Sequence, residues 1–233
     1  MTLKILSYNI HGCVGRGGKE DAEPILQVIR NAKADVVALQ EVQDEDDVDR
    51  SFLNSLGGLG YASVLHGPTM RKAGGHYGNV LMTRHPVIEE EKIDLSYKQR
   101  EPRGAIRARI EVGGMRVEIL ATHLGLGIRE RRTQLEILAK VLPDWGGEAE
   151  DVVRIGLGDF NEWIPGGRTL RLLHGLFGYS PKVATFPAGF PIIPLDRIFV
   201  RPRAALVEVR AYRDLPADRA SDHLPLLAEV SLL

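Results

Sequence analysis

The sequence predicts a mixed α/β fold in which two β-sheets pack together and helices cover their outer faces. Three observations support this fold class. Apolar runs of strand length outnumber the stretches with helical periodicity. Some of these runs join through short glycine turns, as in antiparallel sheets, whereas others are continuously apolar, as in buried parallel strands. Helices separate the strands only in places, which argues against a simple doubly wound sheet.

The first half of the chain supplies strands at residues 3–8, 36–39, 61–65, 79–83 and 87–95. Ile25, Val28, Ile29 and Ala32 recur at helical spacing, so residues 23–32 form an amphipathic helix. The glycine-rich stretch 12–18 is a loop. The acidic stretch 44–49 is expected to begin a second helix that reaches residue 56, because carboxylates are favoured at helix N-termini.

The second half begins with a hairpin. Residues 105–110 alternate apolar and polar side chains, and Gly113-Gly114 turns the chain into a strand at 115–122. A helix follows at 129–142 and ends at Pro143, and a shorter helix spans 168–173. Further strands are expected at 152–157, 195–200, 206–212 and 224–230. Neither a repeat nor a linker interrupts this pattern, so residues 1–233 are interpreted as a single domain.

Composition excludes several classes of function. Lys and Arg total 30 and Asp and Glu total 31, so a net charge of −1 gives no general attraction to nucleic acid or to an anionic membrane. Cys13 is alone, which rules out an intramolecular disulfide and a cysteine zinc site. No apolar run approaches the roughly 20 residues of a transmembrane helix. The N-terminus lacks a secretory signal, so a cytoplasmic location is expected.

Acidic, amide and imidazole side chains stand repeatedly at the ends of the apolar runs. Because strand ends meet at the edges of sheets, these side chains are expected to form one site. Their types are those that hold a hard divalent cation and cleave a phosphoester beside it. The residues are Asn9, Glu41, His123, Asp159, Asn161, Asp196, Asp222 and His223.

Several of these residues have a second interpretation. Asp159 and Asn161 would point the same way from an extended strand, where they could orient a water and steady an anionic oxygen, but they could also form a turn. His223 could lie in a surface loop, or it could be a cation that stabilises a phosphoryl oxygen, with Asp196 holding its ring. His123 could contact phosphate or be a hydrogen-bonded core histidine.

The order and spacing of these residues resemble the endonuclease/exonuclease/phosphatase superfamily from about residue 4 to residue 230. The strings that carry the resemblance to a bacterial branch, often without a defined substrate, are Tyr8-Asn9-Ile10-His11-Gly12, Gly78-Asn79-Val80-Leu81-Met82-Thr83-Arg84, Glu101-Pro102-Arg103-Gly104-Ala105 and Leu195-Asp196-Arg197-Ile198-Phe199. The resemblance implies a four-layer sandwich with the site at one end of two facing sheets. It also implies Mg²⁺ or Mn²⁺, with Glu41 as the principal ligand and with Asn9 and Asp222 near the metal.

The same resemblance implies roles in catalysis. Asp159 would orient the attacking water, and Asn161 would help bind the phosphate. His223 would stabilise the pentavalent phosphorus centre, with Asp196 hydrogen-bonded to it. His123 takes the position of a second catalytic histidine, as in deoxyribonuclease-like members.

One departure from that pattern affects His123. Deoxyribonuclease-like members place a glutamate partner for this histidine near the middle of the chain, and residues 61–83 contain no clear equivalent. His76 lies near the position where that glutamate would be expected. His76 and His11 are therefore candidate substrate contacts, as is Arg103, which resembles the phosphate-contacting arginine segment of the nucleases.

The substrate stays open at this point. A phosphoester in a nucleic acid, a phospholipid or a small phosphorylated molecule would suit the predicted chemistry. The apolar, proline-rich segment 186–194 precedes Asp196 and is expected either to rim the site, which would suit a lipid, or to pack as a loop. A non-catalytic binding module on the same fold is a further alternative, although the intact set of acids and histidines argues against it.

Overall fold

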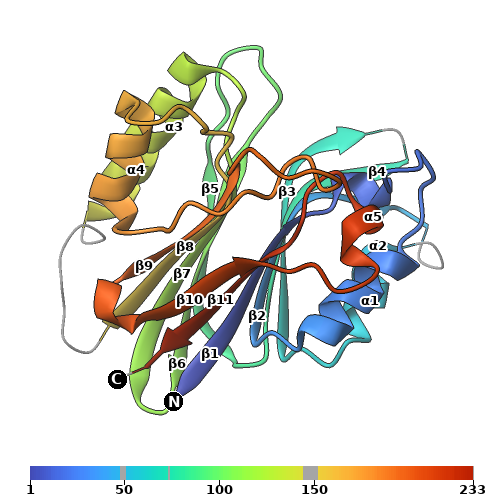
Figure 1. The fold of residues 1–233 in the computed structure, drawn as a ribbon, viewed down its shortest axis with the longest axis horizontal. Coiled ribbons are helices and arrows are strands. Elements are labelled where there is room, and N and C mark those ends of the chain that lie inside the picture. The colour runs from blue at the N-terminus through green and yellow to red at the C-terminus, as the bar shows by residue number, and fades with distance from the viewer. Residues whose placement is uncertain (48–50, 73, 144–151, 233) are drawn as a thin grey trace.

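The computed structural model describes residues 1–47, 51–72, 74–143 and 152–232 (Figure 1). The strands are β1 (Thr2–Asn9), β2 (Val36–Glu45), β3 (Ser63–Lys72), β4 (Gly75–Thr83), β5 (Val87–Asp94), β6 (Gly104–Val112), β7 (Met115–His123), β8 (Val152–Asp159), β9 (Asp196–Arg201), β10 (Leu206–Ala211) and β11 (Leu226–Ser231). The helices are α1 (Glu23–Ala32), α2 (Phe52–Gly57), α3 (Ile128–Val141), α4 (Arg168–Phe177) and α5 (Ala217–Ala220).

These strands form two mixed sheets. One has the order β10-β11-β1-β2-β4-β3 and the other the order β5-β6-β7-β8-β9. Their facing sides share one core, in which Ile5 and Leu81 of the first sheet pack with Ile119 and Ile155 of the second. Every second residue of a strand points to the opposite face, so each sheet also has an outer apolar side that needs a cover.

Helices cover the two outer faces. Leu6 of β1 packs in a cluster with Ile25 and Val28 of α1, which confirms the apolar stripe of that helix. Leu120 of β7 packs with Leu135 of α3 and with residues of α4. Figure 1 shows α1, α2 and α5 on one side of the molecule and α3 and α4 on the other. The fold is therefore the expected α+β sandwich with four layers.

The expected start of the second helix was wrong. Asp44 and Glu45 belong to β2, where they pair with His76 and Gly75 of β4, because the strand ladder continues past its apolar part. The helix begins only at Phe52, and Oδ1 of Asp44 accepts hydrogen bonds from the Ser51 hydroxyl and the Leu53 amide, both at 2.9 Å. The last two residues of the acidic stretch, 48 and 49, lie outside the described residues.

The topology brings several strand ends to one edge of the sandwich. β1 is parallel to β2, and β7 is parallel to β8, so the carboxyl ends of these strands lie side by side. β9 is antiparallel to β8, which places its first residue, Asp196, opposite Asp159. Both termini lie at the other end of the sheets (Figure 1). All these strand ends therefore face the same region, away from the termini.

Candidate active site

Asn9 joins the two sheets at this edge. Its Nδ2 donates a hydrogen bond to Oε1 of Glu41 at 3.0 Å and another to Oδ2 of Asp159 at 3.0 Å. Glu41 lies within a register irregularity of the β2–β4 ladder, between Leu39 and Val42, and has a φ of 58°, in the left-handed region. Such bulges redirect side chains, and a non-glycine residue held in this conformation is a feature of functional sites.

Asp159 and Asn161 are arranged by a turn, not by an extended strand. Asn161 has a φ of 50°, and its backbone amide donates to Oδ1 of Asp159 at 2.9 Å. Asparagine adopts this left-handed conformation more readily than most residues. Its side-chain amide donates to the Leu124 carbonyl at 2.9 Å and lies 3.1 Å from Nε2 of His123. The turn thus places both side chains in the site although they do not share a strand face.

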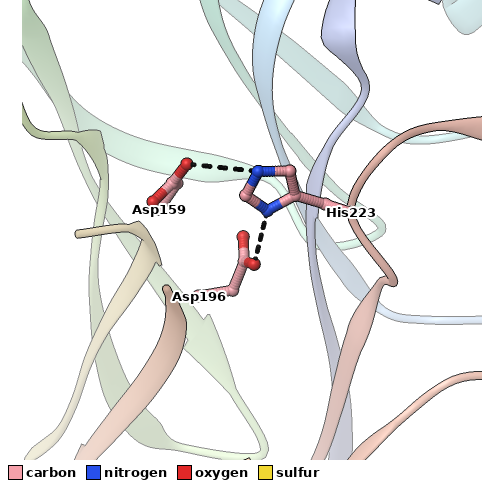
Figure 2. Close-up of side chains that lie close together, drawn as sticks. All are labelled: Asp159, Asp196 and His223. Atoms are coloured by element: carbon pink, nitrogen blue, oxygen red, sulfur yellow. Dashed lines mark hydrogen bonds and ion pairs between the residues drawn. The ribbon is translucent and has the colours of Figure 1, made fainter. Parts of the chain in front are cut away.

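His223 lies between two carboxylates (Figure 2). Its Nδ1 donates to Oδ2 of Asp196 at 2.8 Å, and its Nε2 is 3.9 Å from Oδ2 of Asp159. The Thr185 hydroxyl donates to the same Asp196 oxygen at 2.5 Å, and the Phe186 ring packs against the imidazole with the ring centroids 4.9 Å apart. Asp196 therefore determines the orientation of the imidazole.

The charges of this group favour an imidazolium. Burial by itself would lower the pKa of His223, but the charge of Asp196, the hydrogen bond to it and the charges of Asp159 and Asp222 outweigh burial and raise that pKa to about 10. Burial and the charge of Asp196 raise the pKa of Asp159 to about 6, against the opposing effects of His223 and of the Asn161 and Asn9 hydrogen bonds. At neutral pH the site therefore holds a cation facing a carboxylate that can accept a proton.

His123 is set up differently. Nη1 of Arg103 donates to its Nδ1 at 3.0 Å, and Arg103 is itself paired with Glu101 at 2.9 Å. Burial and the positive charges of Arg103 and His223 hold the pKa of His123 well below its ordinary value. Both ring nitrogens therefore face a donor, Nη1 of Arg103 at Nδ1 and Nδ2 of Asn161 at Nε2, and this arrangement disfavours the charged imidazole. Nε2 also lies 3.5 Å from Oδ2 of Asp159.

Two groups of acids could hold a metal ion. Ligand atoms of Asp159, Asp196 and His223 lie within 4.8 Å of one another. We discount this trio because an imidazolium bound to a carboxylate has no lone pair for a metal. Glu41 and Asp222 are partly exposed, and within the described residues no Lys or Arg forms an ion pair with either. Their open carboxylates, beside Asn9, are the hard oxygen donors that Mg²⁺ prefers, so the donor set fits that ion.

Asp222 and His11 lie beside Asn9. The Ser221 hydroxyl donates to the Asn9 carbonyl at 2.8 Å and lies 3.3 Å from Oδ1 of Asp222. The backbone amide of His11 donates to Oδ1 of Asn9 at 3.1 Å, and its Nδ1 is 3.8 Å from Oδ1 of Asp222. His11 is largely exposed, so it stands at the rim of the site, where a substrate could reach it.

His76 does not join these residues. Its ring contacts the Arg71 guanidinium at 3.1 Å and packs edge-on against His66. The adjacent Tyr77 points the other way and hydrogen-bonds Glu41, and burial and the charge of Glu41 raise the pKa of this tyrosine. Tyr77 is thus a site residue that the sequence interpretation missed, although its position beside His76 was a usable signal.

A two-sheet sandwich with acids, amides and histidines gathered at its strand ends is the DNase I-like fold. The model of the Endonuclease/Exonuclease/phosphatase family matches residues 6–223, and the chain belongs to this family. YbhP of Escherichia coli strain K12, described as uncharacterized, is 30% identical over 254 residues, covering 99% of this chain and 97% of YbhP.

Two solved structures illustrate the shared fold. The human nocturnin catalytic domain with bound sulfate superposes with a TM-score of 0.76 and 23% identity, over 99% of this chain and 93% of that one. D. rerio TDP2 complexed with single strand DNA product superposes with a TM-score of 0.71 and 19% identity, over 99% of each chain. Among the described residues, none of the helices combines the length and apolar character needed to cross a membrane.

Proposed function

We propose that the protein hydrolyses a phosphodiester or phosphomonoester, using Mg²⁺ or Mn²⁺, by in-line attack of water without a covalent intermediate. One observation carries this proposal. The imidazole of His223, bound to Asp196, faces the carboxylate of Asp159 across 3.9 Å. A fixed cation and a proton acceptor at this separation suit a reaction that generates a nucleophile from water and builds negative charge on a phosphoryl group.

The described residues supply most of the machinery. Asp159 orients the water and accepts its proton, and the Asn9 amide holds that carboxylate in place. The amide of Asn161 and the imidazole of His123 lie together in the same space, where they would bind phosphoryl oxygens. His223 would stabilise the charge that develops on the pentavalent phosphorus centre.

Glu41, with Asn9 and Asp222 beside it, would hold the cation. When bound, such an ion polarises a phosphoryl oxygen and stabilises the leaving oxyanion. Family membership supports a phosphoester hydrolase, whereas the identity of the metal rests on the oxygen donors of this site.

The test is turnover of bis(4-nitrophenyl) phosphate with and without Mg²⁺. Glu41→Gln keeps the size of the side chain and removes its charge, so we expect turnover to fall by at least 100-fold with an unchanged thermal unfolding curve. Glu111→Gln, an exposed acid on β6, is the matched control and should retain full activity. Full activity of Glu41→Gln, or of the wild type in excess EDTA, would contradict the proposal.

The choice among nucleic acid, phospholipid and small phosphorylated molecules needs a substrate panel with the same metal-loaded protein. Plasmid DNA, an RNA oligonucleotide and phospholipid vesicles are its three arms. A protein that hydrolyses none of them and shows no heat of Mg²⁺ or Mn²⁺ binding would instead be a binding module on this fold. A cytoplasmic location stays a prediction from the sequence.

A further inference from the structure

Exposed apolar side chains are concentrated around the site. Of twelve exposed large hydrophobic residues among those the structure describes, five lie on three loops that begin or end at site residues, and a sixth, Ile128, begins α3 at the end of one of these loops. We call these six the apolar rim: Leu126, Ile128, Trp163, Ile164, Phe190 and Ile192. The most exposed are Phe190 at 75%, Leu126 at 71% and Ile192 at 62%. Exposed apolar groups gathered in one region mark a surface that binds something.

The three loops are neighbours. Two of them follow β7 and β8, and the third leads into β9. The site ends of these adjacent strands pair as His123 with Asp159 and as Asp159 with Asp196. Buried Arg131 ties two of the loops together, since it binds Glu162 at 3.2 Å and the Leu126 carbonyl at 2.6 Å. The third loop folds back on itself through the bridge between Phe186 and Ile193, which exposes Phe190 at its turn.

Cations flank the apolar rim on two sides. Lys98, Arg100 and Arg129 line a cavity of about 860 Å³ together with Ile128. On the other side the Arg16 guanidinium lies so close to Gly189 that a side chain there would collide with it. Within the described ranges, no carboxylate forms an ion pair with any of these four cations. Their charge is therefore available to an anionic partner, despite the net charge of −1.

We propose that the apolar rim and these four cations form a docking face for an anionic phospholipid bilayer. Trp, Phe, Leu and Ile enter the boundary between head groups and acyl chains, while Lys and Arg contact anionic head groups. Docked in this way, the site would open at the level of the lipid phosphodiesters. That last step rests on the proposed function, whereas the docking itself does not.

Single-stranded nucleic acid fits this face less well. Proteins that bind single-stranded nucleic acid combine cations with aromatic rings on which successive bases stack. Four of the six rim residues are aliphatic, and only Trp163 and Phe190 offer a ring. An aliphatic surface flanked by cations matches a lipid boundary better than a row of bases.

The experiment is flotation with phosphatidylglycerol and phosphatidylcholine vesicles in EDTA, where turnover plays no part. We expect binding to phosphatidylglycerol that weakens with salt and little binding to phosphatidylcholine. Trp163→Ser with Phe190→Ser should lower the partition coefficient by at least tenfold. The control is Ile88→Ser with Val207→Ser, which removes similarly exposed apolar groups far from the rim. It should change the partition coefficient less than twofold.

The cations are tested separately. Lys98→Gln with Arg100→Gln should weaken binding to phosphatidylglycerol by more than tenfold, because each lost charge weakens it by roughly fivefold. If the Trp163 variant unfolds early on heating, Leu126→Ser with Phe190→Ser replaces it.

Wild-type protein that stays off phosphatidylglycerol vesicles would overturn the proposal, as would equal partition of the rim variants. Loss of single-stranded oligonucleotide binding in the rim variants, with vesicle binding unchanged, would assign the face to nucleic acid instead. Failure to hydrolyse both bis(4-nitrophenyl) phosphate and the monoester 4-nitrophenyl phosphate would contradict the proposed function without affecting the docking proposal.

Discussion

Replacing Asp196 with Asn tests whether the charge of His223 drives the reaction. The substitution keeps the size of the side chain and its contact with the Thr185 hydroxyl, but it removes the negative charge 2.8 Å from Nδ1 of His223. The charge of Asp196 is the largest effect that raises the pKa of this histidine. Without it, burial opposes only the weaker influences of Asp159 and Asp222.

The expected loss of charged imidazole in Asp196→Asn follows from the pKa of His223. The pKa of His223 is raised from 6.5 to about 10, and in Asp196→Asn we expect it to return to 6.5 or below. At pH 8 the charged fraction of the imidazole would then fall from about 99% to about 3%, a roughly thirtyfold loss before any loss of orientation. The pair stabilises the folded protein below pH 6.5, and this contribution is lost as the pH rises through about 10.

The assay is the pH dependence of kcat/KM for bis(4-nitrophenyl) phosphate between pH 5 and 10.5. In the wild type we expect the alkaline limb near pH 10, and in Asp196→Asn near or below pH 6.5. Thr185→Val is the control, because it removes the other hydrogen bond to Asp196 and leaves the charge in place. An alkaline limb that stays near pH 10 in Asp196→Asn would refute the assigned role of the pair.

Three further predictions concern the same edge of the sandwich. Gly158→Ala should lower the free energy of unfolding in urea by about 3 kcal/mol, since its φ is 142° and a Cβ there would lie 1.8 Å from the Thr122 carbonyl oxygen; an unchanged midpoint would contradict this. Arg131→Met should cost about 3–5 kcal/mol by leaving Glu162 buried and unpaired, and adding Glu162→Gln should restore much of it, so additive losses in a double-mutant cycle would argue against coupling. Wild-type turnover should rise with pH as Asp159 ionises, at about pH 6, or at a lower pH when a cation is bound. An acid limb that is unchanged in Asp159→Asn would disprove that assignment.

The sequence was most informative where a buried strand ends in a polar residue. Asn9, Asp159 and Asp196 each follow or precede an apolar run, and the strand ladder places them at one edge because neighbouring strands are paired. Burial on both faces makes such strands readable as continuous apolar runs. The contact between His223 and Asp196 could be anticipated for the same reason, since Asp196 begins β9 and His223 shortly precedes β11 at this edge.

The sequence was least informative where tertiary pairing outweighs local pattern. Asp44 and Glu45 read as the start of a helix, yet they extend β2 because β4 lies beside them. The choice between His76 and Tyr77 depends on which face of β4 points inward, and a shift of one residue exchanges them. The irregularity at Glu41 shifts the pairing of β2 with β4 by one residue. The residues around Glu41 contain no sequence signal that predicts this shift.

The partner of His123 explains why no glutamate was found for it. A carboxylate partner would favour the charged imidazole, as Asp196 does for His223, whereas Arg103 disfavours that form and occupies Nδ1 as a donor. The two histidines are therefore opposite in charge state although both face Asp159. A second imidazolium would repel the first and compete for the same carboxylate, whereas a neutral imidazole leaves the negative charge of Asp159 unopposed on that side. The arginine thus allows one acid to remain the proton acceptor between two histidines.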